Sequence, residues 1–239
     1  MTIQYDGTDF HGWQVQAKGR TVQGDIENAL SIIFPEEKIS LFGAGRTDAG
    51  VHALGLVANI KLPQKLSANE LRKAINGNLS QDVRIDSAEV VEDKFHARFS
   101  ATAREYEYRL AKTYSPVTRN FTAPLKWKID TKVLMDCAEI LIGEHDFTQF
   151  CKATAEVDNK NCIVFDSQWK ETSELLIFSI KANRFLQHMV RYLVGAMLEV
   201  GRGRYAVSDF NNLVNNTKSE AVVVRAPAKG LFFKKINYE

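Results

Sequence analysis

The sequence predicts an α+β fold with mainly antiparallel sheets. In several segments apolar and polar residues alternate with a period of two, which is typical of antiparallel strands that expose one face to solvent. Segments with helical spacing of apolar residues occur in both halves of the chain. A chain of 239 residues is long enough for one large domain or for two of about 100 to 120 residues.

The first half of the chain is predicted to contain two helices and four strands. A helix is expected at residues 23–34, where apolar residues recur at helical spacing up to Pro35. A second helix should begin after Ser67, because Ser67 and Glu70 have the spacing of a capping box. The strands expected in this half are residues 2–5, 39–44, 56–62 and 83–90.

The second half is predicted to have a similar mixture. Helices are expected from Thr131 onward and at residues 184–200, and strands at residues 103–110, 163–169 and 175–182. No Pro/Gly-rich linker separates the halves, but one apolar series ends at Phe99 and the next begins at Ala103. We therefore expect an N-terminal subdomain at residues 1–99 and a C-terminal subdomain at residues 100–239.

Composition narrows the class of protein. With 31 basic and 29 acidic residues the net charge is only +2, so a nucleic-acid surface requires asymmetric placement of charge. No basic, apolar N-terminal signal and no apolar window of about 18 residues is visible, which predicts a cytoplasmic protein that does not span a membrane. The three cysteines form no C-x-x-C pair, so neither a disulfide framework nor a metal site is expected.

Residues 43–52 read Gly-Ala-Gly-Arg-Thr-Asp-Ala-Gly-Val-His, and they place a single carboxylate, Asp48, among small residues with Arg46 two positions away. The glycines allow positive φ and close approach of another chain. The segment is not a phosphate-binding loop, because Asp48 stands where G-x-G-x-x-G needs its third glycine. Two interpretations remain open, a reactive acid or a glycine-rich turn capped by an aspartate.

Two tyrosines lie on the same face of the strand expected at residues 103–110. Tyr106 and Tyr108 alternate with charged residues, which is the usual pattern of core aromatics. An aromatic ring beside a carboxylate is also suited to holding an extruded base by stacking. The pattern alone does not decide between these roles.

The helix expected at residues 184–200 combines an apolar surface with a cationic stripe. Its members follow at i, i+4, i+7 and i+11, namely Arg184, His188, Arg191 and Gly195. The stripe could be a solvated face. However, a helix this apolar should be buried, and a buried arginine needs a hydrogen-bonded partner.

Four segments resemble the tRNA pseudouridine synthase A family. Residues 42–52 resemble its catalytic motif, and residues 5–14, Tyr-Asp-Gly-Thr-Asp-Phe-His-Gly-Trp-Gln, its N-terminal signature. Residues 95–108 and 183–201 resemble its central and C-terminal motifs. The four segments span almost the whole chain in the family's order, which makes coincidence improbable.

The resemblance implies a fold and an activity. It implies two similar α/β subdomains whose sheets join into one central sheet, with helices on the outer face and the active-site cleft between the subdomains. The N-terminal subdomain would carry the Asp loop, and the C-terminal one the Tyr strand and the Arg helix. The implied activity is isomerisation of uridine to pseudouridine at positions 38, 39 and 40 of the tRNA anticodon stem-loop, by a homodimer without a cofactor or metal.

The resemblance also assigns roles to residues. It implies that Asp48 is the catalytic carboxylate, Arg191 its ion-pair partner and Tyr106 the active-site aromatic. Arg46 would help to flip the uridine out of its stem, unless it only contacts a phosphate. Leu231 is matched to an apolar residue of the base pocket, although a core strand leucine is the default interpretation. The remaining candidates for substrate binding are Arg184, His188, Arg202 and Arg204.

Two other functions fit these residues less well. An RNA-binding or RNA-chaperone protein of the same fold would have no use for both Asp48 and Arg191. A small-molecule hydrolase that uses Asp48 with His52 lacks a second positioned acid and a nucleophile elbow. A catalytic isomerase therefore accounts best for the residues.

Overall fold

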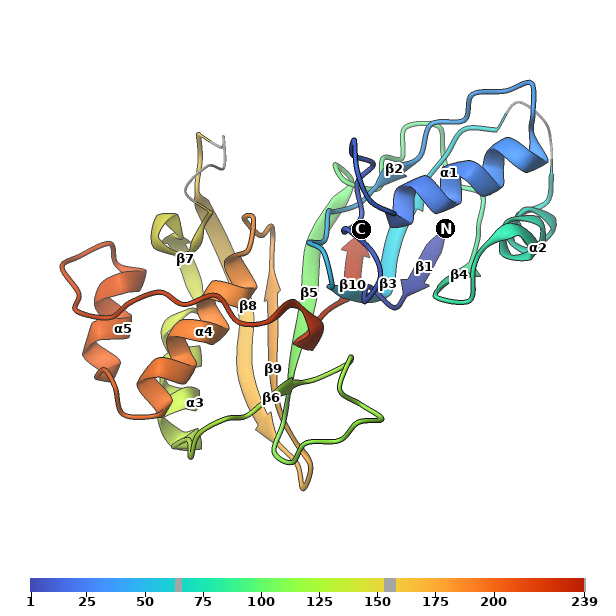
Figure 1. Ribbon diagram of the computed structural model, residues 1–239. Helices are drawn as coiled ribbons and strands as arrows, with labels where there is room; N and C mark the ends of the chain where they lie inside the picture. Colours follow the sequence, from blue (N-terminus) through green and yellow to red (C-terminus); the bar gives the residue numbers. More distant parts are fainter. Residues whose placement is uncertain (63–65, 153–157, 239) are drawn as a thin grey trace. The chain divides into compact units, whose positions relative to one another are not determined.

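The computed structural model describes residues 1–62, 66–152 and 158–238, which form two compact units (Figure 1). Unit 1 comprises Met1–Thr102 and Phe232–Glu239, and unit 2 comprises Ala103–Leu231. Strands β5 and β10 cross the unit boundaries along the chain. Residues 232–238 thus belong to unit 1, whereas the division predicted after residue 99 groups them with the second subdomain.

Unit 1 contains a sheet with the order β4-β1-β3-β10. Strand β1 pairs antiparallel with β3 and β4, whereas β10 runs parallel to β3. A short strand β2 pairs antiparallel with β3. The bounds are β1 Thr2–Tyr5, β2 Phe42–Gly43, β3 His52–Asn59, β4 Val83–Ser87 and β10 Leu231–Tyr238.

The helices of unit 1 begin at side-chain caps. In α1 (Val22–Ile33) the Thr21 hydroxyl accepts a hydrogen bond from the Gly24 N–H. In α2 (Ala68–Asn78) Ser67 and Glu70 form the predicted capping box, so the sequence pattern is confirmed. The apolar side of α1 is buried and belongs to the core of the unit.

Unit 2 contains an antiparallel sheet with the order β5-β9-β8-β7, and β6 pairs parallel with β5. The strands are β5 Ala101–Ala111, β6 Ala123–Pro124, β7 Gly143–Asp146, β8 Asn161–Glu171 and β9 Leu175–Ala182. The helices are α3 Thr131–Ile140, α4 Met189–Gly201 and α5 Val207–Val214, and the 3₁₀ turns are Thr148–Phe150 and Ala228–Gly230.

The three helices of unit 2 lie on one side of its sheet (Figure 1). Helix α3 packs on β8 and also contacts α4 and α5. Alternate residues of β8 face this helical layer and are buried, whereas Ile163 and Phe165 on the opposite face are exposed. The mainly antiparallel α+β fold with helices on an outer face is therefore confirmed.

Several expected elements have different bounds. The strand expected at residues 39–44 is reduced to Phe42–Gly43, and the one expected at 56–62 runs from His52 to Asn59. The helix expected from residue 184 begins at Met189, because His188 adopts the left-handed conformation with φ of 67° and breaks the helical geometry. None of the helices in the described ranges is both long and apolar enough to cross a membrane.

Candidate functional site

In unit 1, the segment that carries Asp48 connects β2 to β3. Thr47 is buried, Asp48 is half-buried and Arg46 is exposed. The Val51 N–H donates to the Asp48 carbonyl at 3.1 Å, and Gly50 has φ of 76°, so the chain turns directly after the aspartate. Asp48 thus lies on a tight turn with its side chain partly accessible.

The N-terminal motif, residues 5–14, contacts this turn through hydrogen bonds to Thr47. The Tyr5 hydroxyl lies 2.7 Å from the Thr47 hydroxyl, and the Trp13 N–H donates to the Thr47 carbonyl at 3.1 Å. Gly12 has φ of 95°, and a Cβ there would lie 2.5 Å from the same carbonyl oxygen. The two motifs are therefore one structural element, and Gly12 is required for their close approach.

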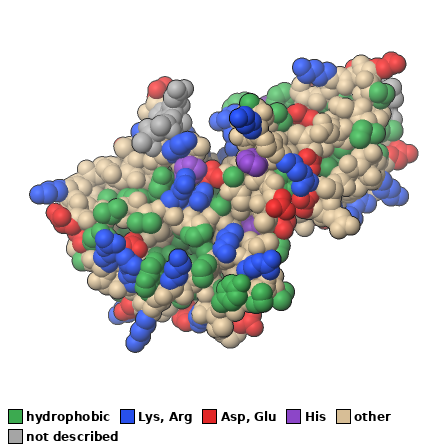
Figure 2. Space-filling view, in the orientation of Figure 1, with side chains coloured by type: hydrophobic (Ala, Val, Ile, Leu, Met, Phe, Trp, Pro, Cys, Tyr) green, Lys and Arg blue, Asp and Glu red, His purple; other side chains and the backbone are tan. Residues whose placement is uncertain are grey.

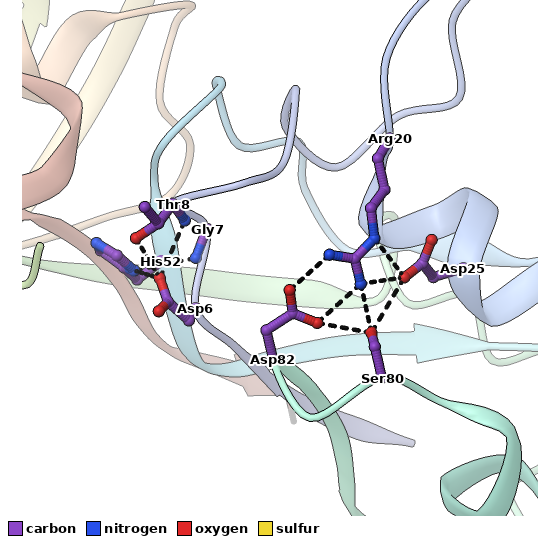
Figure 3. A network of polar contacts seen from close by, with 8 residues as sticks. All are labelled: Asp6, Gly7, Thr8, Arg20, Asp25, His52, Ser80 and Asp82. Atoms are coloured by element: carbon purple, nitrogen blue, oxygen red, sulfur yellow. Dashed lines mark hydrogen bonds and ion pairs between the residues drawn. The ribbon is translucent and has the colours of Figure 1, made fainter.

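His52 is the first residue of β3 and has a structural environment. Its Nδ1 accepts a hydrogen bond from the Gly7 N–H at 3.0 Å (Figure 3). Its ring stacks on Phe232 with centroids 4.8 Å apart. The same Nδ1 lies 3.2 Å from the Asp6 carboxylate. Because Nδ1 already accepts the Gly7 proton, we interpret the Asp6 contact as proximity and not as an ion pair. These contacts give no support to a catalytic role for His52 beside Asp48.

Arg20 belongs to an intramolecular network in unit 1 (Figure 3). Its guanidinium donates to Asp25 and Asp82 at 2.6 Å each and also to the Ser80 hydroxyl. It lies over the Phe10 ring, 4.1 Å from the centroid. The hydrogen bond from Arg20 lowers the pKa of Asp82. Sequence reasoning missed this network because its members are far apart in the chain.

In unit 2, Tyr106 and Tyr108 have different environments although they share a face of β5. Tyr108 is fully buried, and its hydroxyl donates to the Pro227 carbonyl at 2.8 Å. Burial raises the pKa of the Tyr108 phenol above its usual value. Tyr106 is half-buried and makes an edge-to-face contact with Phe185, with centroids 4.9 Å apart. Tyr108 is therefore a core residue of unit 2, whereas Tyr106 is not fully enclosed.

Arg191 lies in α4, which is buried along nearly its whole length, as predicted. Only 8% of Arg191 is exposed, and its Nε donates to the Ala226 carbonyl at 2.8 Å. One turn further, a Cβ at Gly195 would lie 1.7 Å from the Val224 carbonyl oxygen. Arg191 and Gly195 therefore face the same extended segment, and the glycine permits its close approach.

Arg184 and His188 do not continue the stripe of Arg191, and this part of the prediction was wrong. Both precede α4, and the left-handed backbone at His188 changes the direction of the chain. The ring of His188 is instead paired through Nε2 with the Arg225 guanidinium at 3.1 Å. Arg184 is half-buried. Its charge acts to lower the pKa of the Cys162 thiol, against the larger raising effect of burial.

Arg202 and Arg204 follow α4 and share one carboxylate. Both donate to Glu199, at 2.7 Å and 3.1 Å, although only 5% of Glu199 is exposed. Arg202 also lies 4.3 Å from the ring centroid of Trp127. The three side chains carry one net positive charge.

The visible face of unit 2 has Lys and Arg side chains spread among hydrophobic ones (Figure 2).

Leu231 ends unit 2 and begins β10, and it is buried. The residue before it, Gly230, would place a Cβ 2.8 Å from the Tyr108 ring. Tyr108 therefore holds the segment that leads to Leu231 through both its hydroxyl and its ring.

Metal-binding residues do not cluster in the parts of the chain that the structure describes. Burial raises the pKa of the Cys137 thiol to about 12 and that of Cys162 to about 11. These two thiols are therefore protonated at neutral pH.

Comparisons with known proteins give a consistent result. The family model described as tRNA pseudouridine synthase matches residues 1–100 and 137–239. These ranges contain Asp48 and Arg191 but not Tyr106. The chain is 44% identical to "tRNA pseudouridine synthase A" of Chlorobium chlorochromatii, over 100% of this chain and 98% of the relative. It is 40% identical to the protein of the same name from Brachyspira hyodysenteriae, over 98% and 96% of the two chains.

Proposed function

The chain belongs to the tRNA pseudouridine synthase A family, and from this premise we propose that it acts on uridines 38, 39 and 40 of the anticodon stem-loop. As a tRNA pseudouridine synthase it is an isomerase that modifies tRNA.

We propose Asp48 as the catalytic carboxylate. Pseudouridine formation breaks the bond between N1 of uracil and C1′ of the ribose and joins C5 to C1′. The proton on C5 is released and N1 gains one, so nothing is oxidised or reduced. One carboxylate suffices as nucleophile or base, whereas glycoside hydrolysis needs a second carboxyl group to handle water. The partly accessible turn at Asp48 suits this role.

Arg191 is proposed as the ion-pair partner of Asp48. A base that seals the site would desolvate the carboxylate and favour its neutral form, and a nearby guanidinium would oppose this effect. Its Nε is held by the Ala226 carbonyl, which orients the planar group. A lysine could supply the charge but not the fixed fork of donors.

The remaining candidates are proposed to bind the substrate. Tyr106 would stack on the target base or handle a proton, and Arg46 would fill the gap that the flipped uridine leaves. Leu231 would line the base pocket. Contacts to the RNA backbone are proposed for Arg184, His188, Arg202 and Arg204. We further propose a homodimer in which one RNA arm bridges two subunits.

The observation that carries the proposal is the Asp48 turn, whose buried neighbour Thr47 is held by Tyr5 and Trp13 while Asp48 itself is only half-buried. The test uses purified protein and unmodified tRNA transcripts that carry uridine at positions 38, 39 and 40. Pseudouridine mapping at single-nucleotide resolution should find the product at these positions and not elsewhere. Product confined to another arm of the tRNA would overturn the assignment, and product at these positions with Asp48→Asn would overturn the proposed catalyst.

A further inference from the structure

Phe99 is a large aromatic side chain that is 77% exposed on unit 1. Its ring packs on His96 with centroids 4.4 Å apart, and His96 in turn lies 5.5 Å from the ring of Phe42. The three rings therefore form a continuous series that ends in an exposed aromatic face. Isolated exposed phenylalanines need no explanation, but one at the end of a series of ring contacts offers a surface for a further ring.

The loop that carries Phe99 is held in place by hydrogen bonds within the loop. The His96 Nδ1 accepts from the N–H groups of Arg98 and Phe99, at 3.1 Å and 3.4 Å. The Ser100 N–H donates to the His96 carbonyl at 2.9 Å. These bonds fix the turn, so the Phe99 ring is presented without a large loss of conformational entropy on binding.

The same loop is anchored to the hairpin that carries Asp48. The Ala97 N–H donates to the side chain of Asn59 at 2.8 Å, and Asn59 is the β3 partner of Phe42 in β2. The segment that contains Asp48 connects these two paired strands. The ring series is thus part of the scaffold that positions the Asp48 turn.

Arg98 supplies a cation at the end of this series. Its side chain is exposed, and its guanidinium carbon lies 5.6 Å from the centroid of the Phe99 ring. An aromatic face beside a cation matches a nucleobase and its phosphate, because bases stack on aromatic rings and phosphates pair with arginine.

We propose that Phe99 and Arg98 form a stacking platform for an unpaired base of the tRNA substrate, apart from the uridine that reacts. A base with its phosphate would use both the ring and the cation, so an unpaired RNA base is the occupant that the chemistry favours. The proposal rests on the tRNA substrate of the family and not on the role of Asp48. Binding can therefore test it without reference to turnover.

The experiment measures equilibrium binding of unmodified tRNA by filter retention across a salt series. Phe99→Ala should weaken binding by about 5- to 100-fold, the effect of losing one stacked base. The factor should be the same at every salt concentration, because stacking releases no counterions. Arg98→Ala should instead reduce the slope of log K against log salt by about one unit.

Two controls separate stacking from general effects. Tyr114→Ala removes an aromatic that is 70% exposed on unit 2 and should leave binding unchanged. Phe99→Trp should restore binding, and its added fluorescence should change saturably with tRNA after subtraction of a parallel titration of the parent protein, which reports the three native tryptophans. Thermal unfolding of each variant checks that the fold is kept.

Three outcomes would overturn the platform. Phe99→Ala could bind tRNA as tightly as the parent protein, or its defect could match that of Tyr114→Ala. Phe99→Ala could also change the oligomeric state in sedimentation without RNA, which would assign the ring to contact with a second copy of the chain. Each outcome leaves the proposed chemistry at Asp48 untouched.

Discussion

Arg191 and Ala226 are joined by two hydrogen bonds of opposite direction. The Ala226 N–H donates to the Arg191 carbonyl at 3.0 Å, and the Arg191 Nε donates to the Ala226 carbonyl at 2.8 Å. The first bond ties the extended segment to α4, and the second orients the guanidinium. The direction of the arginine fork is therefore set by the backbone of a segment that approaches α4 closely at Gly195.

Replacement of Gly195 by alanine should displace this segment and impair both stability and activity. The added Cβ would overlap the Val224 carbonyl oxygen, which is backbone and cannot rotate away. We expect a loss of at least about 1–3 kcal/mol in the free energy of unfolding, the usual effect of overpacking. Urea denaturation and single-turnover pseudouridine formation measure the two effects.

The matched control is Gly77→Ala in α2, where a Cβ would meet no atom within 4 Å. That variant should be more stable by about 0.5–1 kcal/mol, because alanine loses less backbone entropy in a helix. Equal stability changes in the two variants would refute the close approach at Gly195.

Asp48→Asn should abolish turnover and leave tRNA affinity nearly intact. The amide keeps the shape of the side chain but loses the nucleophilic or basic oxygen. The rate should fall by at least about a thousandfold, as expected for loss of one essential group. Tritium release from tRNA labelled at C5 of uridine measures the rate, and filter retention measures affinity. Asp9→Asn, which alters an exposed carboxylate of the same unit, should keep the parental rate.

The two neighbouring tyrosines of β5 should respond differently to loss of their hydroxyls. Tyr108→Phe leaves the Pro227 carbonyl without its 2.8 Å donor and should lower the free energy of unfolding by about 1–3 kcal/mol. Tyr106→Phe keeps the ring, so a stacking role predicts an unchanged rate and a proton-transfer role predicts a large decrease. Thermal unfolding and single-turnover rates of both variants distinguish these roles. A stability loss confined to Tyr106→Phe would contradict the environments described above.

Arg20→Gln should destabilise the protein in a pH-dependent way. The pKa of Asp82 is lowered from 3.8 in the folded state, mainly by its hydrogen bond to Arg20. The contribution of this pair is therefore present above pH 3.8 and is lost as the pH falls through the folded pKa of Asp82. The melting temperature of Arg20→Gln should lie below that of the parent protein at pH 7, and the difference should shrink at pH 3 and below. A difference that stays constant down to pH 2.5 would show that the pair does not stabilise the fold.

Local patterns predicted local structure well. Strands β1 and β9 occupy the predicted residues, and the capping box at Ser67 forms, because each depends on residues close in sequence. The left-handed residue His188 lies inside a run that keeps helical spacing, so periodicity could not reveal the break. The network of Arg20 and Asp82 joins residues 62 positions apart, and no local signal pairs them.

The same difference between local and long-range signals applies to the functional residues. The composition of its own segment indicates Asp48, whereas only the motif resemblance indicates a role for Arg191 and Tyr106. Nothing in the sequence indicated that Arg202 and Arg204 share the buried Glu199, since a carboxylate three residues from an arginine is equally consistent with a solvated surface.

The last prediction separates charges that bind the RNA backbone from the charge proposed to act on Asp48. Arg202 and Arg204 carry one net positive charge together with Glu199. Replacing both arginines with alanine, with Glu199→Gln to avoid a buried unpaired carboxylate, should reduce the slope of log K against log salt by about one unit. The single-turnover rate at saturating tRNA should fall little, since backbone contacts position the RNA without touching the base.

Arg191→Ala should give the opposite result. Arg191 is only 8% exposed, so it is poorly placed to release counterions from phosphates, and the salt slope should stay near that of the parent protein. The rate should fall steeply, because Asp48 would lose the cation proposed to keep it ionised. Arg191→Lys should recover only part of the rate, since an ammonium lacks the fork held by Ala226. If Arg191→Ala flattens the salt slope as much as the triple variant does, Arg191 contacts a phosphate and the proposed ion pair is wrong.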